Sequence, residues 1–166
     1  MKIKFLTALI LTLVISACQP EDIKEFTPSA SAFALDDLAG TWKATKLEQT
    51  DMDAVRKGFP YKTLDVTSAL GLTNMKLTLN LNGGAPGTFT IDNGSATPLF
   101  SFTNGTWMVD NVEKPSVISL INTPDTVRLT MGSYSNIVNN GMLQLQRSRF
   151  LGNAEVIRYQ FQFVRQ

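Results

Sequence analysis

Apolar and polar residues alternate in short runs along most of the chain after residue 74. In the clearest run, four apolar positions are each followed by a polar one: Met75, Leu77, Leu79 and Leu81. Strict alternation buries one face of a β-strand and leaves the other in water. The same pattern recurs in five later segments: 88–92, 118–120, 127–131, 143–146 and 157–163. These segments therefore predict half-buried strands.

Turn signals rich in Asn and Gly separate these segments, at 82–84, 93–94, 122–125, 139–141 and 152–153. Strands joined by short connections usually pair as antiparallel neighbours. Two further strands, expected near 41–48 and 105–110, bring the predicted total to eight. We expect an all-β fold, an eight-stranded up-and-down antiparallel barrel, because closure removes the open sheet edges. A β-sandwich is the alternative, and the short connections after residue 82 favour the barrel.

One connection is long, from about Gln49 to Asn74. It carries two weak helical signals, at 51–57 and 65–70, each followed by a glycine. As the only connection long enough to cover a barrel mouth, it is expected to act there as a lid over a ligand or as a plug that completes the core. Four side chains are candidates for either role: Phe59, Tyr61, Leu70 and Leu72.

The first 17 residues have the layout of a secretory signal peptide. Lys2 and Lys4 precede an apolar run at 5–15, and small residues follow it. Eleven apolar residues are too few to span a bilayer, which needs about 20. The run therefore predicts export across a membrane rather than a transmembrane helix.

Residues 13–18, Leu-Val-Ile-Ser-Ala-Cys, resemble the bacterial lipobox. The resemblance implies that Cys18 receives a lipid on its thiol, becomes the mature N-terminus and carries acyl chains such as palmitate. Lipid of this kind anchors a protein to a membrane without a transmembrane helix. The alternative is an export signal that is cleaved elsewhere, with Cys18 as an incidental small residue. The position of the chain's only cysteine favours the lipobox.

Residues 18–35 show no period that would bury a face, and we interpret them as a lipidated N-terminus and flexible tether. The predicted domains are thus a signal peptide at 1–17, this tether, and a barrel domain at 36–166. Glu21 and Asp22 resemble the acidic signals with which some diderm bacteria send lipoproteins to the outer leaflet of the outer membrane. A solvated spacer explains them equally well. The expected location is the cell envelope, lipid-anchored to the outer membrane, and surface exposed if the acidic pair is a signal.

The composition narrows the function classes. Fifteen basic and 14 acidic residues leave no strong positive field, which makes nucleic acid a poor partner. The chain has no His and one Cys, so it lacks the commonest metal ligand and general base. The sequence contains no nucleophile elbow, P-loop lysine or metal-ligand spacing. We therefore expect a protein that is not an enzyme, with no catalytic residue, no metal and no cofactor.

Residues 40–42, Gly-Thr-Trp, head the first predicted strand, and a long connection and seven further strands follow. This layout resembles the lipocalin-like domains of short bacterial lipoproteins of unknown function. The resemblance implies that Trp42 closes one end of the barrel and that an arginine near the last strand packs across its ring. Arg165 stands at the best place, with Arg147 and Arg149 as competitors.

Arg147 and Arg149 continue the alternation of the apolar run at 143–145, which points both cations into the barrel if the strand is regular. A bulge or the barrel mouth accommodates them in one interpretation. In the other, they bind the carboxylate head group of a ligand.

Two functions remain open beside the disfavoured enzyme. In the first, the barrel binds a small hydrophobic or amphipathic ligand. In the second, the barrel is filled and its loops contact a protein or glycan partner. Eight strands suit either function, and the bulky inward residues favour the filled barrel slightly.

Overall fold

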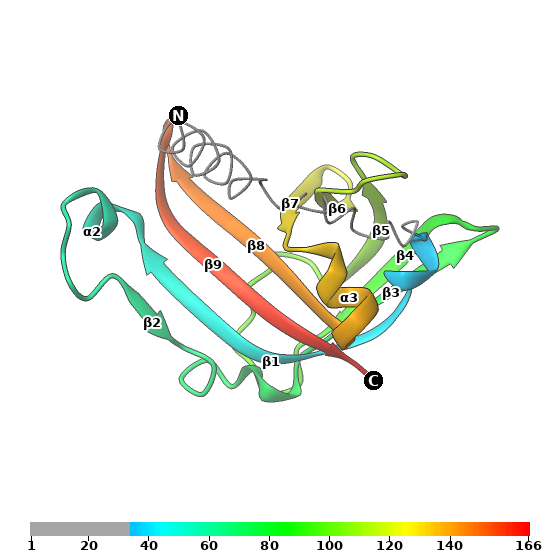
Figure 1. Ribbon diagram of the computed structural model, residues 1–166, viewed down its shortest axis with the longest axis horizontal. Coiled ribbons are helices and arrows are strands. Elements are labelled where there is room, and N and C mark those ends of the chain that lie inside the picture. The colour runs from blue at the N-terminus through cyan, green and yellow to red at the C-terminus, as the bar shows by residue number, and fades with distance from the viewer. Residues whose placement is uncertain (1–33) are drawn as a thin grey trace, which may run out of the picture. The chain divides into compact units, whose positions relative to one another are not determined.

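The computed structural model describes residues 34–166, whose strands form one antiparallel sheet (Figure 1). The strands are β1 (Gly40–Asp51), β2 (Thr63–Asp65), β3 (Lys76–Asn82), β4 (Ala85–Asp92), β5 (Asn104–Val109), β6 (Val117–Asn122), β7 (Asp125–Met131), β8 (Met142–Leu151) and β9 (Ala154–Arg165). The other elements are two α-helices, α2 (Met52–Arg56) and α3 (Tyr134–Asn140), and two 3₁₀ turns, η2 (Leu35–Asp37) and η3 (Leu72–Asn74).

The sheet closes on itself. Neighbouring strands follow the order β1, β3, β4 and so on to β9, and β9 pairs again with β1. In that closing pair, Trp42 lies opposite Arg165 and Leu47 lies opposite Phe161. The eight strands β1 and β3–β9 therefore form the predicted up-and-down barrel, and the β-sandwich is wrong. The ninth strand, β2, adds only three residues beside the end of β1.

Bulky side chains fill the barrel. On β3, Leu77 and Leu79 are buried whereas Thr78 and Asn80 are more exposed, as the alternation predicted. Among the core side chains of residues 34–166 lies a cavity of about 10 Å³, close to the least that holds one water molecule. The barrel is therefore packed rather than hollow.

One end of the barrel, the Trp42 end, is closed by a side chain of β1. Trp42 is fully buried, and its indole N–H donates to the Leu38 carbonyl oxygen at 2.8 Å. The guanidinium carbon of Arg165 lies 4.8 Å from the centre of the ring, and the same guanidinium donates to the Asp37 carbonyl oxygen. The predicted contact of Trp42 with Arg165 is confirmed.

Two connections close the opposite end, the Phe100 end. The turn between β2 and β3 places Leu72 in the core and packs Leu70 against it. The β4–β5 connection adds Phe100, whose ring stacks on Phe161 with centroids 5.8 Å apart. The two connections join where the Thr97 N–H donates to the Leu70 carbonyl oxygen at 3.0 Å. The prediction that only the connection after β1 could cover this mouth is wrong, because the β4–β5 connection supplies the central ring.

The helix predicted at 51–57 is confirmed as α2. The Asp51 carboxylate caps it by accepting hydrogen bonds from the backbone N–H groups of Asp53 and Ala54, at 2.8 and 3.0 Å. Gly58 follows in the left-handed conformation, with a φ of +69°, which ends the helix.

The second helix, predicted at 65–70, is wrong. Residues 63–65 are extended as β2 and pair with residues 48–50 of β1. The Asp65 carboxylate then accepts hydrogen bonds from the backbone N–H and the hydroxyl of Thr67, at 3.0 and 2.6 Å. An aspartate that bonds the backbone two residues ahead favours a turn over a helix, and turns follow as far as Gly71.

α3 occupies the β7–β8 connection, where the sequence predicted only a turn at 139–141. Its sequence is rich in Asn and Ser and has no helical period of apolar residues, so the pattern gave no signal for it. Ile137 is its one buried side chain, and Gly141 ends it at a φ of +57°.

Candidate functional site

Three strands continue past the Phe100 end of the barrel and form what we call the extension: residues 48–51 of β1, 146–151 of β8 and 154–160 of β9. Figure 1 shows β8 and β9 rising as a hairpin beyond β7. Two cross-strand rows continue the inward face of the barrel here: Gln49, Tyr159 and Arg147, then Asp51, Ile157 and Arg149. The sequence-predicted cations therefore lie at the barrel mouth, on the inward face.

Arg147 packs on the Phe100 ring of the plug, which is our name for three side chains of the two connections that close the Phe100 end: Leu70, Leu72 and Phe100. Its guanidinium carbon lies 5.1 Å from the centre of the Phe100 ring, and the guanidinium donates to the Leu99 carbonyl oxygen. The side chain is half-buried, and burial lowers the pKa of Arg147, with the positive charge of Arg149 as the second cause. The cation thus serves the packing of the mouth, as the interpretation based on the barrel mouth expected.

Arg149 lies one row farther out and is exposed. Within residues 34–166, neither Arg149 nor Arg147 forms an ion pair with a carboxylate. The two arginines are close enough for one charge to depress the pKa of the other. Arg147 and Arg149 therefore carry positive charge that no acidic side chain of the described part neutralises by direct contact.

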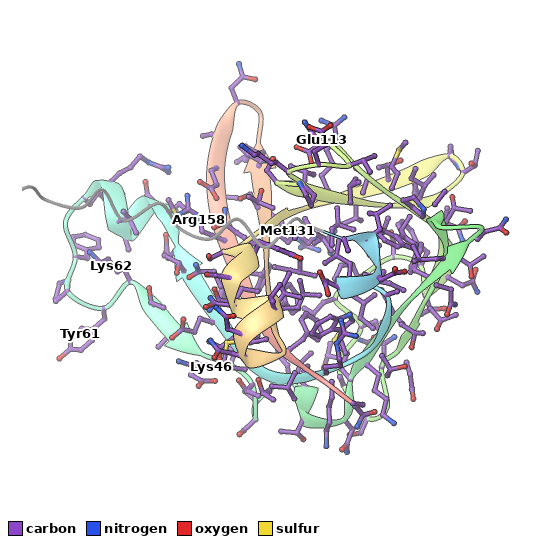
Figure 2. All side chains as sticks on the ribbon, turned by 45° about the vertical axis from the view of Figure 1, so that its right-hand side comes forward. Lys46, Tyr61, Lys62, Glu113, Met131 and Arg158 are labelled. Carbon is purple, nitrogen blue, oxygen red and sulfur yellow. The ribbon has the colours of Figure 1, made fainter. Side chains whose placement is uncertain are left out.

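The six residues proposed for ligand binding do not line one cavity. Leu70 and Leu72 belong to the plug, and Arg147 lies across it. Phe59 and Tyr61 follow α2 and are 53% and 91% exposed, and Figure 2 shows Tyr61 pointing away from the barrel. The connection after β1 is thus a plug in its second half and a surface loop in its first. A ligand role for these residues, and for Arg149, stays a prediction.

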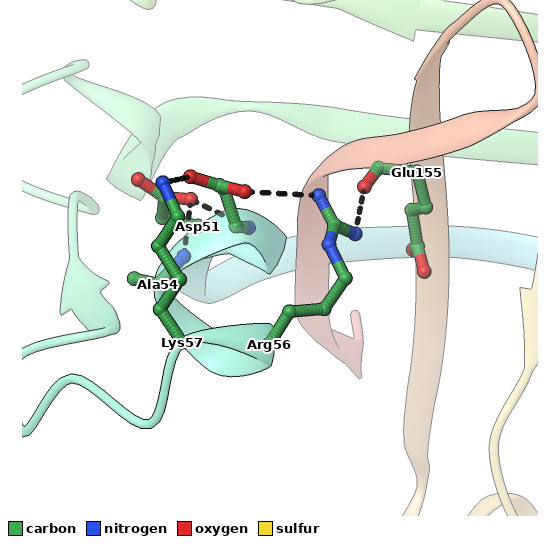
Figure 3. Close-up of polar contacts among 6 residues, drawn as sticks. Asp51, Ala54, Arg56, Lys57 and Glu155 are labelled. Carbon is green, nitrogen blue, oxygen red and sulfur yellow. Dashed lines mark hydrogen bonds and ion pairs between the residues drawn. The ribbon is translucent and has the colours of Figure 1, made fainter.

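A network of polar contacts ties α2 to the extension (Figure 3). Arg56 donates from Nη1 to the Glu155 carbonyl oxygen at 2.8 Å, and Lys57 pairs with Asp53 at 2.6 Å. The Glu155 carboxylate accepts two hydrogen bonds from Arg158, at 2.9 and 2.7 Å. These hydrogen bonds lower the pKa of Glu155, and the Arg158 contact is the largest cause. Arg56 therefore ties α2 to β9, and the Glu155 contacts with Arg158 stabilise the hairpin from within.

A groove of about 160 Å³ runs over the outward face of β1, β9 and β8 (Lys46 and Met131, on its wall, are labelled in Figure 2). Two cross-strand rows line it: Lys46, Gln162 and Gln144, then Glu48, Gln160 and Gln146. The Lys46 ammonium pairs with the Glu48 carboxylate at 2.8 Å, so the remaining groups are neutral amides. The alternation predicted that these side chains face outward. It could not show that the outward curve of the strands hollows the surface.

No known protein-family model matches the chain, and no curated protein does either. In the part of the chain that the structure describes, no group of three or more His, Cys, Asp or Glu side chains could hold a metal ion. None of the helices in residues 34–166 is long and apolar enough to cross a membrane.

Proposed function

We propose that the protein is a non-catalytic lipoprotein of the cell envelope, whose lipocalin-like barrel is a filled scaffold that contacts a protein or glycan partner through its surface. The proposal combines the lipobox-like sequence at residues 13–18 with the packed barrel. Cys18 lies outside the described residues, so its lipidation and the outer-membrane location are predictions from the sequence.

The observation that carries the proposal is the filled interior. Pockets for small molecules measure about 300–1,000 Å³, and the core cavity is far smaller, about 10 Å³. Both ends of the barrel are also closed, by Trp42 with Arg165 and by Phe100 with Arg147. A hydrophobic ligand would have to displace these contacts before it could enter. The outer surface is therefore the better candidate for the functional contact.

The lipid anchor is tested by the variant Cys18→Ala. We expect it to accumulate as an unprocessed precursor and to leave the detergent phase after phase separation, because a lipid chain supplies the membrane affinity. Ser16→Ala keeps the cysteine and serves as the matched control, which should partition like the parent chain. Unchanged partitioning of Cys18→Ala would contradict the anchor.

The filled barrel is tested by thermal unfolding in the presence of fatty acids and phospholipids. A ligand that binds only the folded state stabilises it by about 2.7 kcal/mol at 100 times its Kd, which shifts the Tm by several degrees. We expect no shift with any lipid of the panel. A reproducible shift would favour the ligand-binding hypothesis instead.

A further inference from the structure

Within residues 34–166, the last part of strand β8 has a strand partner on one side only. Its register with β7 consists of Thr130 opposite Gln146 and Met131 opposite Leu145. Its register with β9 continues to Leu151 at the tip of the hairpin. In Figure 1, β7 turns away from β8 at this level. The barrel seam is therefore open along residues 147–151.

The backbone at this seam has polar groups without a strand partner. The Gly132 N–H donates to the Gln144 carbonyl oxygen, so Gln144 turns its backbone groups toward β7. Backbone direction alternates along a strand, and Ser148 therefore turns its N–H and carbonyl the same way, away from β9. Among residues 34–166, no backbone hydrogen bond outside the β8–β9 ladder involves residues 147–151. We call residues 147–151 the β8 edge.

The side chains of the β8 edge carry positive charge and apolar surface. Arg147 and Arg149 lie on one face of it, and neither has a carboxylate partner in the described chain. Phe150 and Leu151, at the tip, are 62% and 76% exposed. An open edge with exposed apolar residues is a template on which an extended chain can add as a further strand.

The charge decides which chain fits. A second copy of the same edge would bring arginine opposite arginine, and like charges directly across a ladder destabilise it. An extended segment with acidic residues at alternate positions would place a carboxylate beside the exposed Arg149, whereas the Arg147 guanidinium already contacts Phe100 and the Leu99 carbonyl oxygen. Guanidinium and carboxylate groups form the stronger class of hydrogen bonds.

We propose that the β8 edge is the docking site for an extended acidic segment of a partner protein, which adds to the sheet beside residues 147–151. The inference rests on the proposed function, since it names the chemistry of the partner that the filled barrel would contact. The backbone groups at Ser148 supply the affinity, and the exposed Arg149 selects the charge of the segment.

The experiment uses the full chain, purified in detergent, and two fluorescent heptapeptides in which valine alternates with glutamate or with lysine. We expect the glutamate peptide to bind and the lysine peptide to bind at least about tenfold more weakly. The charge reversal Arg149→Glu should weaken binding of the glutamate peptide and strengthen binding of the lysine peptide. Equal binding of the two peptides, or no binding of the glutamate peptide, overturns the inference.

A second pair of variants tests the edge backbone itself. Ser148→Pro removes the N–H that faces the open side and leaves the β9 ladder its donors, so we expect loss of peptide binding in a folded chain. Ser148→Ala keeps the N–H and loses only the hydroxyl contact with Glu155, so it should bind like the parent. Undiminished binding by Ser148→Pro overturns strand addition.

If Ser148→Pro fails to fold, hydrogen exchange on the parent chain gives the answer. Strand addition should slow the exchange of the Ser148 amide when the glutamate peptide is added, and unchanged exchange contradicts it. None of these measurements depends on the lipid anchor. A failure of peptide docking therefore leaves the partitioning of Cys18→Ala unaffected, and the two proposals can fail separately.

Discussion

The two ends of the barrel are closed by the same chemical arrangement on different supports. At the Trp42 end, Arg165 lies 4.8 Å from the ring centre, and at the Phe100 end Arg147 lies 5.1 Å from the ring centre. Each guanidinium also donates to a backbone carbonyl of the segment that covers its end. Trp42 belongs to a strand, however, whereas Phe100 belongs to a connection. The two ends therefore use the same pairing of an aromatic ring with a guanidinium, although a strand carries the ring at one end and a connection carries it at the other.

The support determines what each ring contributes to stability. Trp42 is held by the β1 ladder on both sides and by its indole hydrogen bond, so the surroundings cannot collapse onto its place. Phe100 is held by packing and by the join between two connections, which can move together when the ring is removed. We therefore expect a larger loss of stability at the Trp42 end.

The largest effect is expected for Trp42→Ala. Removing a fully buried tryptophan costs about 3–5 kcal/mol, from lost burial and from the cavity that remains. Urea unfolding of the variant and of the conservative Trp42→Phe should show this loss for alanine and a smaller one for phenylalanine. If Trp42→Ala lowered the free energy of unfolding no more than the substitution of an exposed residue does, the expected larger contribution of the Trp42 end would be contradicted.

Phe100→Ala should have the next largest effect, about 3 kcal/mol, at the lower limit for a buried aromatic ring. Because this ring fills the mouth, its loss should also let an apolar dye enter the core, which the parent excludes. Phe102→Ala, on the same connection but only partly buried, is the matched control and should admit less dye. Equal dye binding by the parent and Phe100→Ala would show that the mouth is not closed by this ring.

Replacing the two arginines should give losses of stability that differ less than those of the two rings, and the larger loss should occur at the Phe100 end. Arg165 is exposed and Arg147 is half-buried, and cation–π contacts are worth about 0.5–1 kcal/mol when exposed and about 2 when desolvated. Arg147→Ala should therefore destabilise more than Arg165→Ala. Double-mutant cycles with Phe100→Ala and Trp42→Ala separate the ring contacts from the carbonyl contacts. A larger coupling at Arg165 would reverse the ranking.

The smallest effects concern pH. Asp110 accepts hydrogen bonds from Ser116 and Val117 in the β5–β6 connection, which lower the pKa of Asp110, the Ser116 hydroxyl first. Arg158 likewise lowers the pKa of Glu155. A lowered pKa in the folded state means that stability is fully present above the unfolded value, about pH 4, and is lost as the pH falls toward the folded value.

Acid titration of unfolding compares these two carboxylates, one at each end of the barrel. Asp110→Asn and Glu155→Gln should each flatten the loss of stability below about pH 4 relative to the parent. Asp36→Asn, near the start of the described residues, serves as the control for a change of net charge. A parent chain whose stability does not change between pH 4 and 2 would contradict both assignments.

The strands of the barrel could be predicted because their physics is local. On β3, the alternation that buries Leu77 and Leu79 is visible in seven consecutive residues, and a turn with glycine follows. The Trp42 contact could be expected only through the resemblance to lipocalin-like domains. Nothing in the alternation itself pairs residue 42 with residue 165.

The connections could not be predicted in the same way. Phe59 and Leu72 are both apolar residues of one connection, yet the first is 53% exposed and the second is buried. Phe100 lies in a segment without any period, and its burial depends on where β4 ends and β5 begins. The open seam at 147–151 depends on β7 and β8 separating beyond the Thr130–Gln146 pair, although β7 continues to Asp125, and this is a relation between two strands and not a property of either.

The pairing of β1 with β9 has a consequence for how the chain acquires its structure. The other barrel pairs join strands that follow one another in the chain, with only the short β2 between β1 and β3, whereas this pair joins residues 42–51 to residues 157–165. Contacts of such large sequence separation form slowly, because the intervening chain must lose its freedom before they contribute. The six hairpin pairs from β3–β4 to β8–β9 can form before β1 pairs with β9. The refolding rate of this barrel should therefore report on a single late event, the docking of its first strand against its last.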